Sequence, residues 1–163
     1  MKYIWSPWRM EYIKSDKQKG GCVFCNELDK ADSEDNLIVK RFNFSCAILN
    51  RFPYTSGHMM IVPFEHQASL EFLSQETLAE MMEATVKTIK VLKKVYNPQG
   101  FNIGVNIGEA AGAGILEHVH MHIVPRWGGD TNFISILGDV RILPETLEDS
   151  YNHIKFTWHE LYS

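Results

Sequence analysis

The chain has little of what would place a protein in a membrane, in a disulfide-rich class or on nucleic acid. No apolar run reaches the ~18–20 residues that a membrane span needs, so we expect no membrane partner. Three cysteines, a small and odd number, argue against a disulfide framework. A formal net charge of −4 argues against nucleic acid as a partner. The start, with Lys2, Trp5 and Arg9, lacks the pattern of a signal peptide, so the expected localisation is cytoplasmic.

The composition is that of a single globular domain. Hydrophobic residues make up 45% of the chain and charged residues 22%, which suits a chain that buries a core. No repeat, low-complexity tract or linker divides the sequence. We therefore predict one domain over residues 1–163, with a core at about 20–130, an N-terminal arm at 1–19 and a C-terminal extension at 131–163.

Three histidines stand at alternate positions with apolar residues between them, and they are His118, His120 and His122. A β-strand points successive side chains to opposite faces, so a strand over 117–124 places the three imidazoles on one face. The intervening apolar residues would pack on the other face. Neighbours on one face repeat every ~6–7 Å, which is close enough for three imidazoles to serve one ligand or one reacting group. A ladder of surface histidines is the alternative.

Hydrophobic periodicity predicts an α+β fold with antiparallel strands. Short β-type runs at 36–41 and 44–49 form an expected hairpin, and further strands are expected at 58–62, 101–107 and 117–124. A long helix is expected after the N-cap Ser74, with residues 97–100 ending it. Pro144 is expected to open a C-terminal helix. The apolar stripe of that helix would cover either the sheet of the domain itself or that of a partner.

The middle histidine is a candidate nucleophile. An imidazole attacks phosphorus or a carbonyl carbon when one ring nitrogen is available and a hydrogen bond holds the other. His120 has a histidine on each side, so His118 could take a structural or metal role while His122 binds or protonates a leaving oxygen. Such unequal roles suit a two-step covalent mechanism. The glycine-rich loop at 108–114 precedes the histidines and suggests a backbone cradle for phosphate.

A Cys-x-x-Cys pair, Cys22 and Cys25, indicates a second kind of chemistry. Two thiolates at this spacing hold one zinc ion at bond lengths near ~2.0–2.3 Å, with His66 and one histidine of the triad as available partners. Four such ligands make a closed, structural site. A reduced dithiol without a metal and a catalytic zinc held by the triad are the alternatives. Cys46 lies in an apolar run and is expected to be an inert core residue.

Together these motifs resemble the histidine triad (HIT) superfamily, whose signature is His-φ-His-φ-His-φ-φ with φ apolar. Residues 118–124 fill all seven places. Residues 5–9 and 125–133 are similar to a bacterial branch that includes diadenosine tetraphosphate phosphorylases and proteins like the fragile-histidine-triad hydrolases. The resemblance implies a HIT-like fold, which is a five-stranded antiparallel sheet with two main helices. It also implies a homodimer with a continuous ten-stranded sheet.

The resemblance assigns roles to residues of this chain. His120 matches the nucleophile that forms a covalent nucleotidyl-histidine, His122 the histidine near the scissile phosphate, and His58 a fourth histidine that supports the triad. Asn50 matches a position that hydrogen-bonds ribose. The other expected substrate contacts come from the segment before the triad, and they are Asn106, Gly112, Gly114 and Ile115. The zinc-bearing members hold their metal with the residues that match Cys22, Cys25, His66 and His118.

The expected function is therefore that of a dinucleoside polyphosphate phosphorylase or hydrolase, with diadenosine tetraphosphate as the substrate. The expected cofactor is a structural zinc, and a divalent cation could arrive with the substrate. Many hydrolase members carry Ala-Gly-Gln-Ser/Thr before the triad, whereas this chain has Ala-Gly-Ala-Gly at 111–114. This departure favours the phosphorylase-like branch and contacts from backbone N–H groups. The alternatives are a nucleotide-binding regulatory protein with little turnover and a nucleoside phosphoramidate hydrolase.

Overall fold

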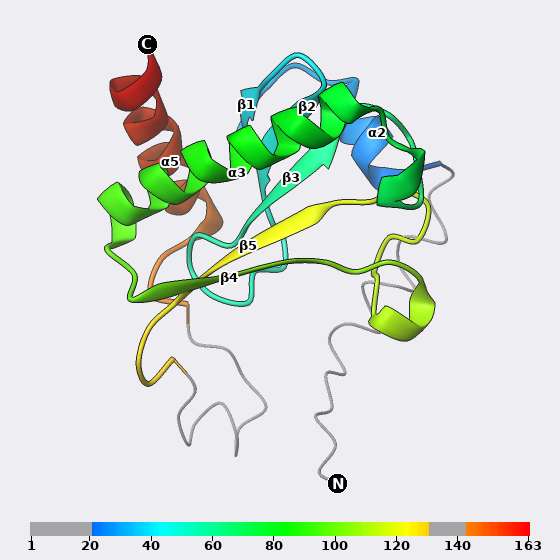
Figure 1. Ribbon diagram of the computed structural model, residues 1–163. Coiled ribbons are helices and arrows are strands. Elements are labelled where there is room, and N and C mark those ends of the chain that lie inside the picture. Colours follow the sequence, from blue (N-terminus) through cyan, green and yellow to red (C-terminus); the bar gives the residue numbers. More distant parts are fainter. Residues whose placement is uncertain (1–20, 131–142) are drawn as a thin grey trace, which may run out of the picture.

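The computed structural model describes residues 21–130 and 143–163. One antiparallel sheet of five strands forms the centre of the molecule, in the order β1-β2-β3-β5-β4 (Figure 1). The strands are β1 Ile38–Arg41, β2 Ser45–Leu49, β3 Met59–Pro63, β4 Gly100–Val105 and β5 Met121–Arg126. The described helices are α2 Val23–Leu28, α3 Gln75–Tyr96 and α5 Leu147–Tyr162, with short 3-10 turns η1 Leu70–Phe72 and η2 Glu109–Ala111. The predicted α+β class and five-stranded sheet are confirmed.

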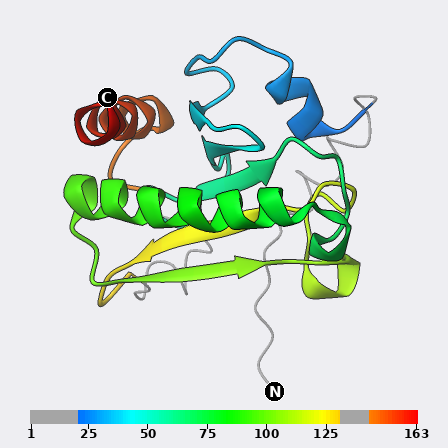
Figure 2. The ribbon, with the colours of Figure 1, turned by 45° about the horizontal axis from the view of Figure 1, so that its top comes forward.

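The long helix α3 lies across one face of the sheet (Figure 2). The Ser74 side chain caps its start by accepting a hydrogen bond from the Thr77 N–H, and Asn97 ends it in the left-handed conformation. The Glu80 carboxylate accepts hydrogen bonds from the N–H groups of Asn43 and Phe44, at 2.9 and 2.8 Å. These bonds tie the turn between β1 and β2 to the helix. The predicted bounds of the helix are confirmed.

The C-terminal helix α5 covers the domain's own core. Tyr151, Ile154 and Trp158 are all buried, and the helix packs against α3 and β1. The expected start at Pro144 is wrong by three residues, because the Thr146 hydroxyl accepts a hydrogen bond from the Asp149 N–H and caps the first turn. The apolar stripe at this end of the chain therefore serves the fold of the protomer.

The strand that carries the histidines begins later than expected. It runs from Met121 to Arg126, and its pairing with β3 ends at Ile61 opposite Met121. Pro63 has no N–H to continue the ladder, and its carbonyl oxygen lies 2.9 Å from His118 Nε2. The Val119 N–H instead donates to the Gln67 carbonyl. The segment before the strand is thus held by loop contacts, and the predicted strand at 117–124 is corrected to this range.

Two other differences lie beside the site. Strand β4 ends at Val105, two residues before the predicted end, and the chain then turns through η2. The Cys-x-x-Cys segment forms α2, a helix that the sequence pattern did not predict. The predicted arm at 1–19 and residues 131–142 of the predicted extension lie outside the described residues. Within the described ranges, no helix has the length and apolar character that crossing a membrane requires.

Candidate active site and metal centre

The histidines of the triad lie on the face of the sheet opposite α3. The Thr85 hydroxyl, on α3, donates to the Met121 sulfur at 3.3 Å, so the Met121 side chain points toward the helix. His120 and His122, the neighbours of Met121 in the sequence, therefore point to the face away from α3. The rings of His120 and His122 meet edge to face, with centroids 4.8 Å apart. Alternation thus places His120 and His122 on one face, as the sequence pattern predicts, although the strand begins only at Met121 and His118 lies in the segment before it.

The carbonyl of His118 fixes which nitrogen of the His120 ring carries the proton. Its Nδ1 lies 3.0 Å from the His118 carbonyl oxygen, which only accepts hydrogen bonds, so Nδ1 carries the proton. The lone pair of the neutral ring is then on Nε2. Burial lowers the pKa of His120, and the ring is therefore neutral at pH 7. A neutral imidazole with a fixed tautomer has the form that a nucleophile requires.

A chain of hydrogen bonds also sets the tautomer of His122. The Tyr54 backbone N–H donates to His58 Nδ1 at 3.1 Å, so His58 carries its proton on Nε2. That nitrogen lies 3.0 Å from His122 Nδ1 and donates to it. His122 consequently carries its own proton on Nε2. His58 is fully buried, and this contact gives a physical basis to its expected supporting role.

Sequence reasoning missed two aromatic residues that shape the triad. The Phe24 ring lies edge-on to the rings of His118 and His120, at 5.4 and 4.9 Å between centroids. The Tyr54 ring lies 4.6 Å from that of His58. Phe24 stands between the two cysteines and Tyr54 shortly before His58, so their positions beside the motifs were the available signals.

Some backbone N–H groups of the glycine-rich segment before the triad donate hydrogen bonds to carbonyls within the same segment. The N–H of Gly112 donates to the Glu109 carbonyl and that of Ala113 to the Gly108 carbonyl. Among the expected backbone donors, Gly114 and Ile115 therefore remain the better candidates for a phosphate contact. Asn106 directly follows β4 and is half-buried.

Strand β4 places a glycine beside the third histidine, His122. Gly104 is the partner of His122 in the pairing of β4 with β5. A Cβ placed at Gly104 would meet no heavy atom of the described residues within 4 Å, so this neighbour of the imidazole adds no side chain beside it.

A cavity of about 450 Å³ lies beside the histidines, between α2, β2 and the loop that follows β2. This volume is in the range of small-ligand pockets. Phe24 and Asn50 both line it, and each also contacts a histidine, since the Asn50 amide nitrogen lies 3.4 Å from the His58 ring nitrogens. Phe24 therefore lies between the cavity and the rings of His118 and His120, and no histidine is among the residues that line the cavity in the described part of the chain. Asn50, expected to contact ribose, is at the junction.

Four metal-ligating side chains converge next to this cavity. Their ligand atoms all lie within 4.8 Å of one another, and the residues are Cys22, Cys25, His66 and His118. His118 Nδ1 lies 3.3 Å from the Cys22 sulfur and 3.6 Å from that of Cys25. A tetrahedron with bonds of ~2.0–2.3 Å has edges of roughly 3.3–3.8 Å, so this donor set fits zinc. His118 Nε2 donates to the Pro63 carbonyl, which orients Nδ1 toward the thiols.

The thiol pKa is raised both for a cysteine of the cluster and for the cysteine of the core. Burial and the neighbouring Cys22 raise the pKa of Cys25 to about 11, so a bound cation would be needed to hold the Cys25 sulfur as a thiolate. Burial raises the pKa of Cys46 to about 12. Cys46 is fully buried in β2, as expected for an inert core residue.

Comparisons with known proteins agree with this geometry. Residues 31–129 match the family model of the HIT domain. The AP-4-A phosphorylase of Mycobacterium tuberculosis is 38% identical over 165 residues, covering 97% of this chain and 85% of that protein. The asymmetrical bis(5'-nucleosyl)-tetraphosphatase of Schizosaccharomyces pombe is 32% identical over 57% of this chain and 50% of that protein. A crystal structure of a Zn-bound histidine triad family protein from Mycobacterium smegmatis superposes with a TM-score of 0.69 and 27% identity, covering 86% of this chain and 95% of that one.

Proposed function

Because the chain belongs to the HIT domain family, we propose that it is an enzyme that cleaves dinucleoside polyphosphates, with diadenosine tetraphosphate as a substrate. The single observation that carries the proposal is the state of His120. A buried, neutral ring has its Nδ1 proton held by a carbonyl, which leaves Nε2 as the nucleophile beside a cavity that suits a nucleoside. The similarity to relatives that are named for this chemistry supports the same interpretation.

The proposed reaction has two steps. His120 Nε2 attacks the α-phosphorus, the bond from that phosphorus to the bridging oxygen breaks, and a nucleotidyl-histidine forms. The His122 Nε2–H donates to a phosphate oxygen as negative charge develops on the leaving nucleotide, and His58 holds His122 in this tautomer. Phosphate or water then attacks the intermediate, releases a nucleotide and restores the neutral imidazole. Asn50 is proposed to bind the ribose, and a divalent cation could accompany the polyphosphate.

We expect phosphorolysis rather than hydrolysis, because the loop before the triad lacks the polar pair of many hydrolases. Incubation of diadenosine tetraphosphate with the protein and inorganic phosphate is expected to yield ADP and ATP in equal amounts. Separation of the products by ion-exchange chromatography measures this ratio. A yield of AMP and ATP, independent of phosphate, would instead identify a hydrolase. Tight nucleotide binding without any product over hours would favour a regulatory protein.

We also propose that Cys22, Cys25, His66 and His118 hold a structural zinc ion. Four protein ligands close the coordination sphere, so the ion would supply stability rather than a site for water or substrate. The site would then fix α2, whose Phe24 packs on His120. We further propose that the protein is cytoplasmic, because a reducing compartment keeps thiol ligands from forming disulfides. Fractionation of the source cells would test this localisation.

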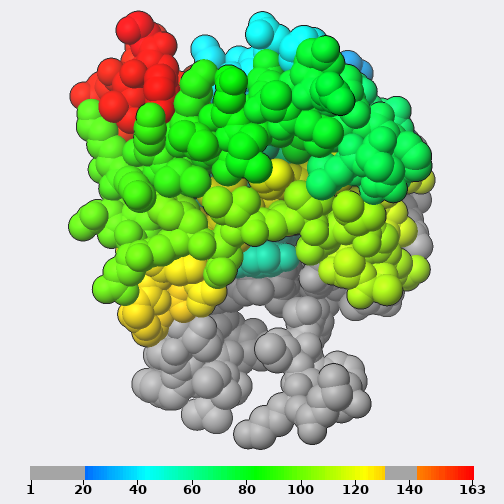
Figure 3. Space-filling model, in the orientation of Figure 1, coloured from blue at the N-terminus to red at the C-terminus, as the bar shows by residue number. Residues whose placement is uncertain are grey.

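The partner we propose is a second copy of the chain, joined along β4. This strand is at the edge of the described sheet (Figure 1), and its part of the chain lies on the face of the molecule that Figure 3 shows. Its Ile103 is 47% exposed. Light scattering is expected to give a mass about twice the 18.8 kDa of one chain. Ile103→Glu, which places like charges across that edge, is expected to give the single-chain mass. Phe156→Glu alters an exposed apolar residue of α5 and should leave the dimer intact; a wild-type monomer would contradict the proposal.

A further inference from the structure

We propose that Glu27 makes the nucleoside cavity select guanine over adenine. The inference rests on the proposed function, since it takes this cavity to be where the base binds. Glu27 lies on α2 and lines the cavity together with Lys30 and Asn50. It is the one carboxylate among the residues that line this cavity in the described part of the chain.

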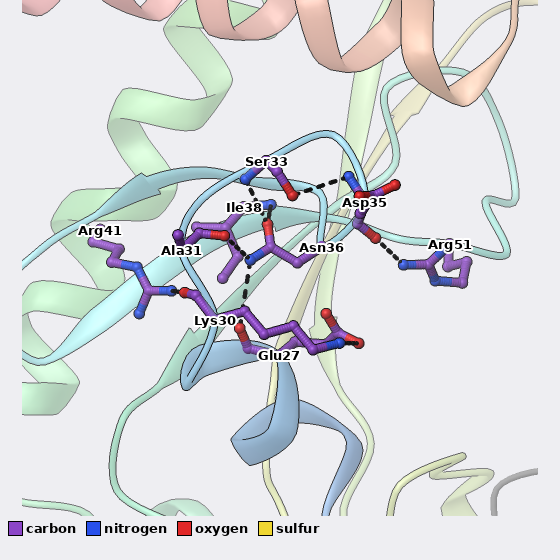
Figure 4. A network of polar contacts seen from close by, with 9 residues as sticks. All are labelled: Glu27, Lys30, Ala31, Ser33, Asp35, Asn36, Ile38, Arg41 and Arg51. Atoms are coloured by element: carbon purple, nitrogen blue, oxygen red, sulfur yellow. Dashed lines mark hydrogen bonds and ion pairs between the residues drawn. The ribbon is translucent and has the colours of Figure 1, made fainter.

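One oxygen of this carboxylate has a donor and the other does not. Glu27 Oε1 accepts a hydrogen bond from Lys30 Nζ at 2.9 Å (Figure 4). Oε2 is buried and has no hydrogen-bond partner in the described part of the protein. A buried oxygen left without a donor is unfavourable, and more so when it is charged. A ligand donor would remove this cost once the Glu27 side chain, which is 21% exposed, turns this oxygen toward the cavity.

The remainder of the cavity suits a purine ring. Apolar side chains form much of its wall, including Leu37, Ile48 and Met60. Asn50 marks the part of the wall that adjoins His58, where the ribose is proposed to lie. Glu27 on α2 and Lys30, two residues beyond its end, form an ion pair on another part of the wall. A base held by the apolar wall would therefore present its polar edge to this pair.

The pattern of donors and acceptors favours guanine. The Lys30 ammonium offers a donor, and the Glu27 carboxylate offers two acceptor oxygens. The Watson–Crick edge of guanine is the complement, because O6 accepts while N1–H and the N2 amine donate. Adenine has one donor on this edge, the N6 amine, and its N1 is an acceptor. Adenine would thus satisfy one oxygen of Glu27 and place a lone pair against the other.

The test measures base preference by binding as well as by turnover. Titration calorimetry with GMP, IMP and AMP is expected to give affinities in that order, since IMP keeps N1–H but lacks the N2 amine. GMP is expected to bind at least about tenfold more tightly than AMP, in line with the discrimination typical of a bidentate pair. The kcat/KM for diguanosine tetraphosphate should exceed that for diadenosine tetraphosphate in the same sense.

Glu27→Gln and Glu34→Gln form a matched pair of variants. Both exchange a carboxylate for an amide, but Glu34 is exposed and does not line the cavity. The amide of Glu27→Gln offers one acceptor and one donor, which complements adenine, so its ratio of GMP to AMP affinity is expected to fall to one or below. Glu34→Gln is expected to keep the wild-type ratio. Thermal melting of both variants measures any purely structural effect.

The outcomes separate this inference from the proposed function. A wild-type protein that cleaves both dinucleotides without preferring guanine would overturn the role of Glu27 and leave the proposed function standing. The role of Glu27 is likewise overturned if Glu27→Gln lowers the melting temperature but keeps the base preference, since Glu27 would then serve only the ion pair. A protein that neither binds mononucleotides nor cleaves either dinucleotide would overturn both.

Discussion

Replacing His120 with alanine is expected to lower kcat for diadenosine tetraphosphate by at least about 10⁴-fold, the scale seen when an enzyme loses its nucleophile. The reason is that Nε2 of this ring forms the covalent bond in the proposed mechanism, and the neighbouring rings have other roles. His118 Nδ1 faces the thiols, and His122 Nδ1 accepts from His58. Neither can replace the missing nitrogen without losing its own partner.

Single-turnover kinetics and mass spectrometry measure this result. The wild-type protein mixed with substrate and no phosphate is expected to gain the mass of one nucleotidyl group, and His120→Ala is expected to gain none. His159→Ala is the matched control, because His159 is exposed on α5 and lies outside the site. Since His120 is buried, melting of the variant is measured in parallel. A folded His120→Ala protein that retains activity would show that another group attacks phosphorus.

Removal of zinc is expected to destabilise the protein strongly. An ion present at a thousand times its dissociation constant contributes about 4 kcal/mol to stability. For a chain of this size, that corresponds to a melting temperature lower by roughly 8–16 °C after chelation. Cys25→Ser is expected to give a similar loss, because Cys25 is a proposed ligand whose sulfur approaches both His66 and His118. Calorimetry and elemental analysis measure stability and metal content on the same samples.

Cys46→Ala serves as the control for the loss of a cysteine. Cys46 lies in the core, so its replacement could cost stability, yet the zinc content is expected to stay at one ion per chain. If chelation abolishes activity while the melting temperature holds, the metal is catalytic and the structural proposal is wrong. If the purified protein binds no zinc at any added concentration, the four residues form a metal-free cluster.

Local patterns along the chain were sufficient for much of the fold. Alternation of side chains predicted that histidines two positions apart share a face, and capping chemistry at Ser74 and Asn97 predicted the bounds of α3. These features depend on residues within a few positions of one another, where backbone geometry leaves few alternatives. The start of β5 could not be predicted in this way, because it depends on Pro63, whose missing N–H ends the pairing from another strand.

The chemistry of the candidate site was predicted from residue types and their spacing. Three imidazoles recur at every second position, two thiols stand three positions apart, and glycines precede the histidines. Long-range packing supplied what these spacings leave open. The packing of the folded chain decides which nitrogen of His120 carries the proton and which histidine faces the thiols. It also leaves one oxygen of Glu27 without a hydrogen-bond partner among the described residues. The spacing of residues in the sequence limits which side chains can come together. The tautomer and the buried partners of each ring depend on the groups that the folded chain packs around it.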